Sequence, residues 1–174
     1  MRECVGEKMR AVIQRVKRAS VTVNDDVVSS IGPGLLVLVG VREGDTRDDL
    51  EWLSNKILKV RLFPGAASAE EGGGGGGKPW DANVMQASLE VLMVSQFTLY
   101  GFFKGNKPDF HNAMAPGPAK AFYEDFLAHA RNDVYKGHAE RIKDGVFGAM
   151  MDVELVNDGP VTMCLDSNDR KPGG

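Results

Sequence analysis

Two short segments of the sequence carry residue types that could do chemistry. The first, Ser95-Gln96-Phe97-Thr98-Leu99, directly follows an apolar run that reads as a buried strand. Polar residues at such a place suggest a strand end that lines a pocket, where backbone N–H groups and hydroxyls would hold a carbonyl oxygen as it gains negative charge. From the pattern alone, an amphipathic strand that merely reaches the surface explains the segment equally well.

The second segment is Asn157-Asp158-Gly159-Pro160-Val161-Thr162. Its composition predicts a turn before a strand, which is also the simpler, purely structural interpretation. Glycine before proline additionally allows unusual backbone angles and a cis peptide bond. Held rigidly, such a turn could present carbonyl oxygens as a steric and polar gate.

Other familiar chemistry is missing from the sequence. The histidines 111, 129 and 138 are too far apart for a standard metal spacing, and no CxxC or HxxxH pattern adds to them, so no metal or cofactor is predicted. We expect His129 to be exposed or half-buried beside the apolar face of a helix. No GxSxG or GxGxxG pattern occurs, and no pair of carboxylates stands out, so a conventional acid or base is not evident.

The composition places the chain among ordinary soluble domains. It has 174 residues, 43% hydrophobic and 26% charged, which suits one domain with a substantial core. The formal charge of −3 argues against bulk electrostatic coating of DNA or RNA, but allows a grip on a single RNA end. Lys104 and Lys107 belong to local positive clusters. No apolar run is long enough to span a membrane, no secretory signal is evident, and we expect a cytoplasmic protein without a disulfide framework.

Hydrophobic periodicity predicts an α+β domain with mostly antiparallel, barrel-like sheet and two main helices. One helix should begin at Asp45 or Thr46, and the other has an apolar face from Ala119 to Ala130 with prolines 116 and 118 at its start. Residues 101–118 read as a loop. Strands are expected at 19–23, 27–28, 35–39, 90–100, 153–155 and 161–165.

We expect the domain to cover residues 9–167, after an N-terminal extension at 1–8 and before a disordered tail at 168–174. Residues 66–79 include six consecutive glycines followed by Lys78 and Pro79. No Ser or Thr follows the lysine as a phosphate-binding loop requires, so a flexible surface insertion is the better interpretation.

Together the two chemical segments resemble the D-aminoacyl-tRNA deacylase (D-Tyr-tRNA(Tyr) deacylase) family. That family carries an SQFTL motif and a later NxGPVT motif, and both are complete here as Ser95–Leu99 and Asn157–Thr162. The resemblance spans about residues 9–167. Further similar stretches are 9–16, 34–40, 104–108 and 145–149.

The resemblance implies a homodimer whose active sites lie between subunits. Gly159 and Pro160 would be joined by a cis bond, oriented by Arg15, and would reach into the partner's site to exclude L side chains. The substrate would be D-aminoacyl-tRNA, and glycyl-tRNA mischarged on tRNA-Ala would also be accepted.

The resemblance also implies roles for individual residues. The catalytic residues would be Ser95, Gln96, Phe97 and Thr98, and backbone N–H groups near Ser95, Gln96 and Phe97 would hold the ester carbonyl or the substrate's amino acid. Phe147 and Gly148 would border the terminal adenosine, since an aromatic ring suits an unpaired base. Lys104 and Lys107 are candidate phosphate contacts. Thr98 has been regarded as a nucleophile in the family, but no base is evident to activate it, so assistance by the tRNA 2′-OH is the alternative.

The sequence departs from the family pattern in two places, and two alternative functions of the same fold stay open. The region around the glycine run does not follow the family's compact pattern, and Ala149-Met150-Met151 stands where many members have an acidic residue. The same fold could instead remove L-alanine with a trans Gly-Pro and altered motifs. It could also be a noncatalytic module that binds the tRNA acceptor end.

Overall fold

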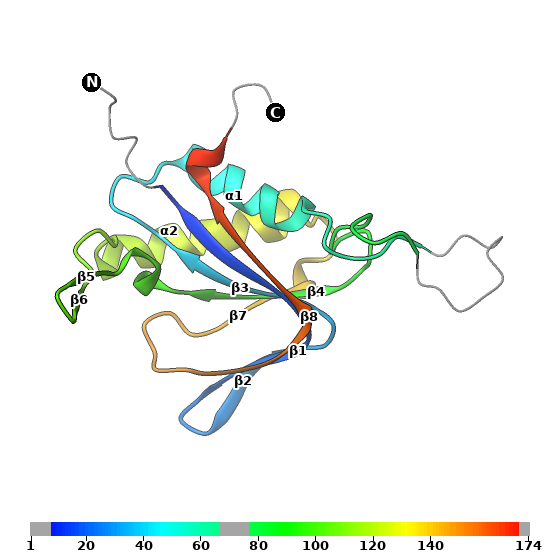
Figure 1. Cartoon of the computed structure of the whole chain (residues 1–174), viewed down its shortest axis with the longest axis horizontal. Helices are drawn as coiled ribbons and strands as arrows, with labels where there is room; N and C mark the ends of the chain where they lie inside the picture. Colours follow the sequence, from blue (N-terminus) through cyan, green and yellow to red (C-terminus); the bar gives the residue numbers. More distant parts are fainter. Residues whose placement is uncertain (1–7, 67–76, 171–174) are drawn as a thin grey trace.

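The computed structural model describes residues 8–66 and 77–170 (Figure 1). Residues 1–7, 67–76 and 171–174, which hold most of the predicted extension, insertion and tail, lie outside the described residues. The chain remains ordered past 168, since η4 (Ser167–Asp169) is a 3-10 helix and the Arg170 side chain binds Asp49. The ordered domain therefore ends later than the predicted start of the tail.

The sheet is built around the long strand β1 (Arg10–Val23). One edge of β1 pairs with β8 (Asp152–Asp166), and the other pairs first with β3 (Gly34–Gly40) and then with β2 (Asp26–Ile31), all antiparallel. Strand β4 (Glu90–Ser95) lies beside β3, and β7 (Ile142–Asp144) lies beside β4, both parallel. The prediction of an α+β domain with mostly antiparallel, barrel-like sheet is confirmed, and the two pairings of β4 are the parallel exceptions that make the sheet mixed.

Both main helices, α1 (Arg47–Lys59) and α2 (Pro116–His129), lie on one side of this sheet (Figure 1). Apolar side chains of α1 and α2 pack with β1, β3 and β4 into the larger core, which includes Leu53, Phe126 and Val37. A second, smaller core fills the inner side of the curled sheet around Val21 and Leu92. The sheet therefore buries both faces, which explains why β3 and β4 are almost uniformly apolar.

Helix α2 follows the prediction at its start, with Pro116 and Pro118 in its first turn. It continues as a π-helical turn, η2 (Ala130–Val134). His129 is buried, which corrects the expectation of an exposed or half-buried side chain. Its Nδ1 lies 2.7 Å from the Ser54 hydroxyl of α1, so a polar pair supplies the partner that burial demands.

The late strand differs from its prediction. The sequence suggests a turn between two strands, but β8 runs continuously from Asp152 to Asp166. In the ladder, Arg15 faces Val161 while the next residue, Val16, faces Asn157, so residues 158–160 bulge out of the strand. The Gly-Pro bend is therefore carried on a paired strand rather than at a hairpin end.

The Asp49 side chain, in the first turn of α1, binds residues from both ends of the domain. Its buried carboxylate accepts hydrogen bonds from the amide and hydroxyl of Thr46, at 2.9 and 2.7 Å, so Thr46 is the helix cap. It also accepts from the Ser167 hydroxyl at 2.9 Å and pairs with Arg170 at 2.5 Å and Lys8 at 3.5 Å. Burial alone would raise the pKa of Asp49, but these bonds and charges outweigh burial and lower it.

Replacing Asp49 with Asn should therefore destabilise the fold by about 2 kcal/mol at neutral pH, because buried donors lose a charged acceptor. The folded pKa is depressed, so the stability due to this charge is present above the unfolded value of about 3.9 and is lost as pH falls through the folded pKa. Urea unfolding of wild type and D49N from pH 7 to pH 3 checks this, and the gap should shrink at low pH.

The matched control is D48N, which neutralises the neighbouring exposed carboxylate of the same helix turn. It should change stability by only a few tenths of a kcal/mol. Equal effects of the two variants, or a D49N gap that does not depend on pH, would contradict this account.

Candidate active site

The parallel strands decide which candidate residues meet. Strands β4 and β7 run in the same direction, with Met93 opposite Asp144, and the Gly145 amide donates to the Met93 carbonyl at 3.1 Å. The chain thus leaves β4 at Ser95 and β7 at Asp144 on the same edge of the sheet. This brings the Ser95–Thr98 segment and the Phe147–Gly148 turn to one end of the domain.

The motif itself is not a strand. The sequence predicts strand through Tyr100, but β4 ends at Ser95 and Phe97–Tyr100 form the 3-10 helix η1. Tyr100 explains the change, because its ring is buried and its hydroxyl donates to the carbonyls of Lys8 and, at 3.3 Å, Gly40. Burial raises the pKa of this hydroxyl, so it remains a neutral donor. Tyr100 was missed as a positioning residue, although a polar aromatic directly after the motif was visible.

Arg10 holds the same end of η1. Its guanidinium donates to the Leu99 carbonyl at 3.4 Å, lies 5.5 Å from the Tyr100 ring centre and pairs with Asp166 at 3.0 Å. The motif is thereby tied to β1 and to the end of β8. Nothing in the local sequence around Arg10 pointed to this contact, which joins residues far apart along the chain.

Some backbone amides of the motif already donate to carbonyl groups of the fold, and others do not. The Gln96 amide is occupied, since it donates to the Val39 carbonyl at 2.7 Å. The first amide of η1 that donates to a backbone carbonyl is that of Leu99, at 3.3 Å from the Gln96 oxygen. Within residues 8–66 and 77–170, the amides of Phe97 and Thr98 have no backbone acceptor. They are the donors that could hold an oxygen with developing negative charge.

The Thr98 hydroxyl lies beside an amide rather than a base. Its hydrogen-bond partner in the described chain is the Gln96 side-chain nitrogen, which cannot take up a proton. Ser95 is half-buried at the end of β4. The arrangement can therefore bind and polarise a carbonyl group, but it offers no base that would turn Thr98 into a nucleophile.

The Phe147–Gly148 turn is shaped by its glycine and by α2. Gly148 has a φ of +77°, a conformation that favours glycine, and the Ala149 amide donates to the Val146 carbonyl at 3.1 Å. The half-buried Phe147 ring lies 5.9 Å from the ring centre of Tyr123. This places a partly accessible aromatic ring on the sheet edge that also carries the motif.

The Gly159-Pro160 bend is held by Arg15. The peptide bond is cis, the isomer that the resemblance implies, and both residues are exposed. The Arg15 guanidinium donates to the carbonyls of Asp158 at 3.3 Å and Leu62 at 2.5 Å, and it pairs with the Asp158 carboxylate at 3.2 Å. Gly159 has a φ of +125°, and a Cβ there would lie 2.8 Å from a Val161 methyl group.

The bend and the motif lie far apart within one chain. Arg15 of β1 lies beside the bend and opposite Leu35 of β3, and Leu35 lies opposite Val91 of β4. The motif begins farther along β4, at Ser95. Four residues along β4 and three strand spacings from β8 to β4 correspond to about 15–20 Å in a curved sheet. The structure therefore brings the motif and the Phe147 turn together, but leaves the bend in the middle of β8, level with the other end of β4.

The two candidate phosphate contacts differ. Lys104, in β5 (Phe102–Lys104), pairs at 2.6 Å with Asp109 of β6 (Lys107–Asp109). Lys104 and then His111 lower the pKa of the Asp109 carboxyl, so it stays ionised. Lys107 is exposed beside the hairpin turn. The predicted loop at 101–118 thus contains a hairpin in which Lys104 is largely neutralised.

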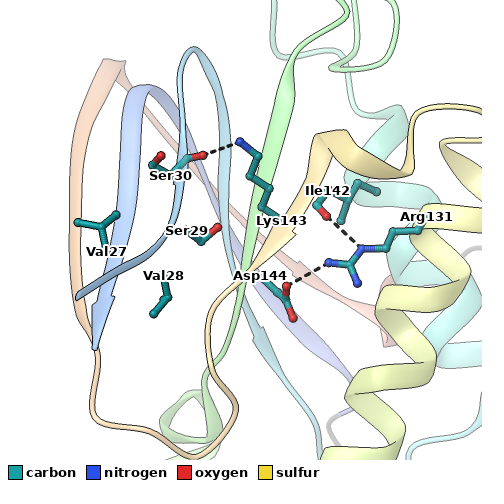
Figure 2. Close-up of a pocket in the computed structure, with 8 residues that line it drawn as sticks. All are labelled: Val27, Val28, Ser29, Ser30, Arg131, Ile142, Lys143 and Asp144. Atoms are coloured by element: carbon teal, nitrogen blue, oxygen red, sulfur yellow. Dashed lines mark hydrogen bonds and ion pairs between the residues drawn. The ribbon is translucent and has the colours of Figure 1, made fainter. Parts of the chain in front are cut away.

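A groove of about 430 Å³ lies elsewhere, between the edge strands β2 and β7 (Figure 2). Its charged side chains are already paired. Lys143 donates to the Ser30 carbonyl at 2.7 Å (Figure 2). Arg131 donates to the Asp144 carboxylate at 3.1 Å and to the Ile142 carbonyl at 3.0 Å. None of the predicted site residues lines it. The groove is best explained as the gap where the curled sheet does not close.

Three further features of the described residues were compared with the site: metal-ligand clusters, membrane-spanning helices and free cysteines. Over residues 8–66 and 77–170, no three His, Cys, Asp or Glu side chains gather as a metal site would require. Among the described helices, none has the length and apolar character needed to cross a membrane. Cys164 is a free, exposed cysteine on β8.

Comparison with known proteins agrees with the two motifs. The profile of the D-Tyr-tRNA(Tyr) deacylase family matches residues 12–166. A D-aminoacyl-tRNA deacylase of Dictyostelium discoideum is 50% identical over 93% of this chain and 100% of that protein. One of Drosophila melanogaster is 52% identical over 94% and 95%, and D-aminoacyl-tRNA deacylase 1 of Homo sapiens is 48% identical over 91% and 70%.

Solved structures are similar over the same range. One titled "c-Myc DNA Unwinding Element Binding Protein" has a TM-score of 0.80 and 45% identity, covering 94% of this chain and 99% of that one. Another, of a probable eukaryotic D-amino acid tRNA deacylase, has a TM-score of 0.73 at 21% identity, covers 91% and 98%, and shows the shared fold. The fold and motifs thus define a deacylase-type domain. The chain belongs to the D-Tyr-tRNA(Tyr) deacylase family.

The contacts of Arg15 predict the effect of a conservative change. Lysine carries its donors on one nitrogen and cannot reproduce the spread of the guanidinium, which reaches Asp158 and Leu62 through different nitrogens, so R15K should loosen residues 158–161. Hydrogen exchange followed by mass spectrometry should show faster exchange at the amides of Asp158, Gly159 and Val161. R18K is the matched control. Arg18 lies on the same strand as Arg15, but its ion pair with Glu154 of β8 is between exposed side chains. Unchanged exchange in R15K would show that Arg15 does not fix the bend.

Proposed function

We propose that this chain is a homodimeric hydrolase that cleaves the ester between a D-amino acid and the 3′ end of tRNA. Family membership over nearly the whole chain and the names of its relatives support this activity. The observation that carries the chemistry is the pair of free amides at Phe97 and Thr98, at the sheet edge that also presents Phe147.

Water is the nucleophile in this proposal. As it attacks the ester carbonyl, negative charge develops on the carbonyl oxygen, and the two amides stabilise it. Thr98 has an amide as its hydroxyl partner, which argues against a threonyl ester intermediate. The tetrahedral intermediate formed by water then collapses, the bond between the acyl carbon and the 3′ oxygen breaks, and the proton lost by water passes through the 2′-OH of the terminal adenosine to that 3′ oxygen, which releases free D-amino acid and tRNA. The adenine base lies against Phe147 and Gly148. Such a site needs no acid–base pair and no cofactor.

Chirality is selected by exclusion in the proposal. A second copy of the chain supplies its Gly159-Pro160 bend to the motif of the first, and the carbonyl oxygens of the bend occupy the space that an L side chain would need. The exposure of the bend and its estimated distance of about 15–20 Å from its own motif favour this exchange between subunits. Glycine has no side chain to exclude, so glycyl-tRNA mischarged on tRNA-Ala is accepted as well.

The remaining parts of the proposal concern the tRNA body and the compartment. With a net charge of −3, the chain binds through a few cations near the acceptor end rather than through a broad basic surface. Lys107 is the better phosphate contact, because Asp109 neutralises Lys104. The cytoplasm, where aminoacyl-tRNA is used in translation, is the expected location.

Hydrolysis of matched D- and L-tyrosyl-tRNA by the purified protein tests the function directly. We expect a D:L ratio of kcat/KM of at least about 10³, because a steric clash with rigid backbone costs several kcal/mol. L-alanyl-tRNA belongs in the same assay. Rapid hydrolysis of L-alanyl-tRNA would favour the L-alanine form of the fold, and tRNA binding without turnover would favour a noncatalytic module.

A further inference from the structure

A tryptophan ring lies against the arginine that holds the Gly159-Pro160 bend. The guanidinium carbon of Arg15 lies 5.6 Å from the centre of the Trp80 ring, close enough for an aromatic face to attract a cation. Arginine suits such a contact, because its planar guanidinium can stack on a ring while its N–H groups donate to other partners. In Arg15 these partners include the carbonyls of Asp158 and Leu62. The ring and the carbonyls therefore bind the same guanidinium without competing for it.

The fold itself makes little use of the Trp80 ring. Its side chain is 54% exposed, and within residues 8–66 and 77–170 it belongs to neither hydrophobic core. The backbone of Trp80 has a φ of +59°, a left-handed conformation that suits glycine or asparagine and in which a bulky residue is an outlier. Such strained residues persist where other contacts hold them, and they gather at functional sites. The contact with Arg15 is an interaction that offsets this strain.

The turn that carries Trp80 is attached to the same piece of backbone that Arg15 binds. Phe63 and Ala82 exchange two backbone hydrogen bonds of 3.0 Å, and the Asp81 amide donates to the Phe63 carbonyl at 3.0 Å. The side chains of Phe63 and Ala82 are buried in the larger core. Because Arg15 donates to Leu62, directly before Phe63, the ring and the guanidinium share one anchored segment. The ring therefore has a defined position relative to Arg15.

Arg15 also lies directly against the glycine of the bend. A Cβ on Gly159 would lie 3.4 Å from a terminal nitrogen of the Arg15 guanidinium. The Asp158 carboxylate, which pairs with this guanidinium, is partly exposed, so water competes for that ion pair. A displacement of the guanidinium would release both the Asp158 carbonyl and Gly159. The position of the bend therefore depends on what else holds Arg15.

We propose that Trp80 is a positioning residue for substrate selection, whose ring holds the Arg15 guanidinium against the Gly159-Pro160 bend and thereby keeps L-aminoacyl-tRNA out of the site. The inference rests on the proposed function and deepens it, since it names a further residue on which specificity depends. The bend leaves its excluding position for a small fraction of the time, and an L substrate is admitted only in that fraction. Loss of the ring raises this fraction. A D substrate needs no such opening, so its hydrolysis is unchanged.

Two substitutions separate the ring from the turn that carries it. W80N removes the ring but suits the left-handed backbone, whereas W80F keeps a ring in the same strained turn. W80N should raise kcat/KM for L-tyrosyl-tRNA about three- to fivefold, the effect of losing one partly exposed contact of this kind, and leave the value for D-tyrosyl-tRNA unchanged. W80F should stay near wild type on both. D81N, which removes the exposed ion pair between Asp81 and Arg61 in the same turn, is the matched control and should equal wild type.

Hydrogen exchange reports the bend without any substrate. In W80N, the amides of Asp158, Gly159 and Val161 should exchange faster by the same factor as the rise in L hydrolysis, because both depend on the displaced bend. In W80F and D81N, these amides should exchange as in wild type. Added to R15K, W80N should have little further effect on exchange or on L hydrolysis, because the ring acts through the guanidinium.

Other outcomes overturn the inference. An equal loss of D and L hydrolysis in W80N would place Trp80 in the reaction or in folding, and unchanged exchange would show that the ring does not hold the bend. Dissociation of W80N in analytical ultracentrifugation would assign the ring to a contact between two copies of the chain. If wild type hydrolyses neither substrate, the proposed function fails, and the exchange of wild type, W80N and W80F still decides whether Trp80 holds Arg15 against the bend.

Discussion

The register of the sheet is the constraint on which the rest of this structure depends. Side chains of β3 and β4 are buried on both faces, and a slip of one residue would exchange the two cores, so the pairing is strongly specified. Together with the parallel pairing of β4 and β7, this register gathers the motif and the Phe147 turn at one edge. The register also fixes the Gly159-Pro160 bulge of β8 near the other end of β4.

The proposed site relies on backbone groups more than on side chains. In the proposal, the free amides at Phe97 and Thr98 supply polarity, and the exposed bend near Arg15 supplies shape. Neither needs a titrating group, which is consistent with a sequence in which no acid, base or metal cluster stands out. The buried residues Tyr100 and Asp49 do not touch this site directly, but they fix the elements that carry it.

Much of this arrangement could be predicted from the sequence, because periodicity and turn chemistry are local. The two main helices and the buried strands at 35–39 and 90–95 were predicted correctly, whereas the backbone conformation of both motifs was not. The predictions failed where distant residues decide the conformation. Tyr100 bends the motif into a 3-10 helix through carbonyls of Lys8 and Gly40, and pairing with β1 keeps β8 continuous through the bend. His129 is buried because Ser54 of another helix satisfies it.

Mixed dimers test most directly whether the bend acts on the partner's motif. G159A disrupts the bend, because its Cβ would meet Val161, and F97P removes one free amide at a helix start where proline fits. F97P should be nearly inactive on both tyrosyl-tRNA stereoisomers, whereas G159A, which has lost the exclusion, should also hydrolyse L-tyrosyl-tRNA. After subunit exchange in equal amounts, each intact motif of a mixed dimer faces the intact bend of its partner, so only the G159A homodimers, about a quarter of the dimers, should accept the L substrate. The mixture should therefore show about a quarter of the L activity of the same total amount of G159A alone. If it shows about half, the bend serves its own chain and the account is wrong.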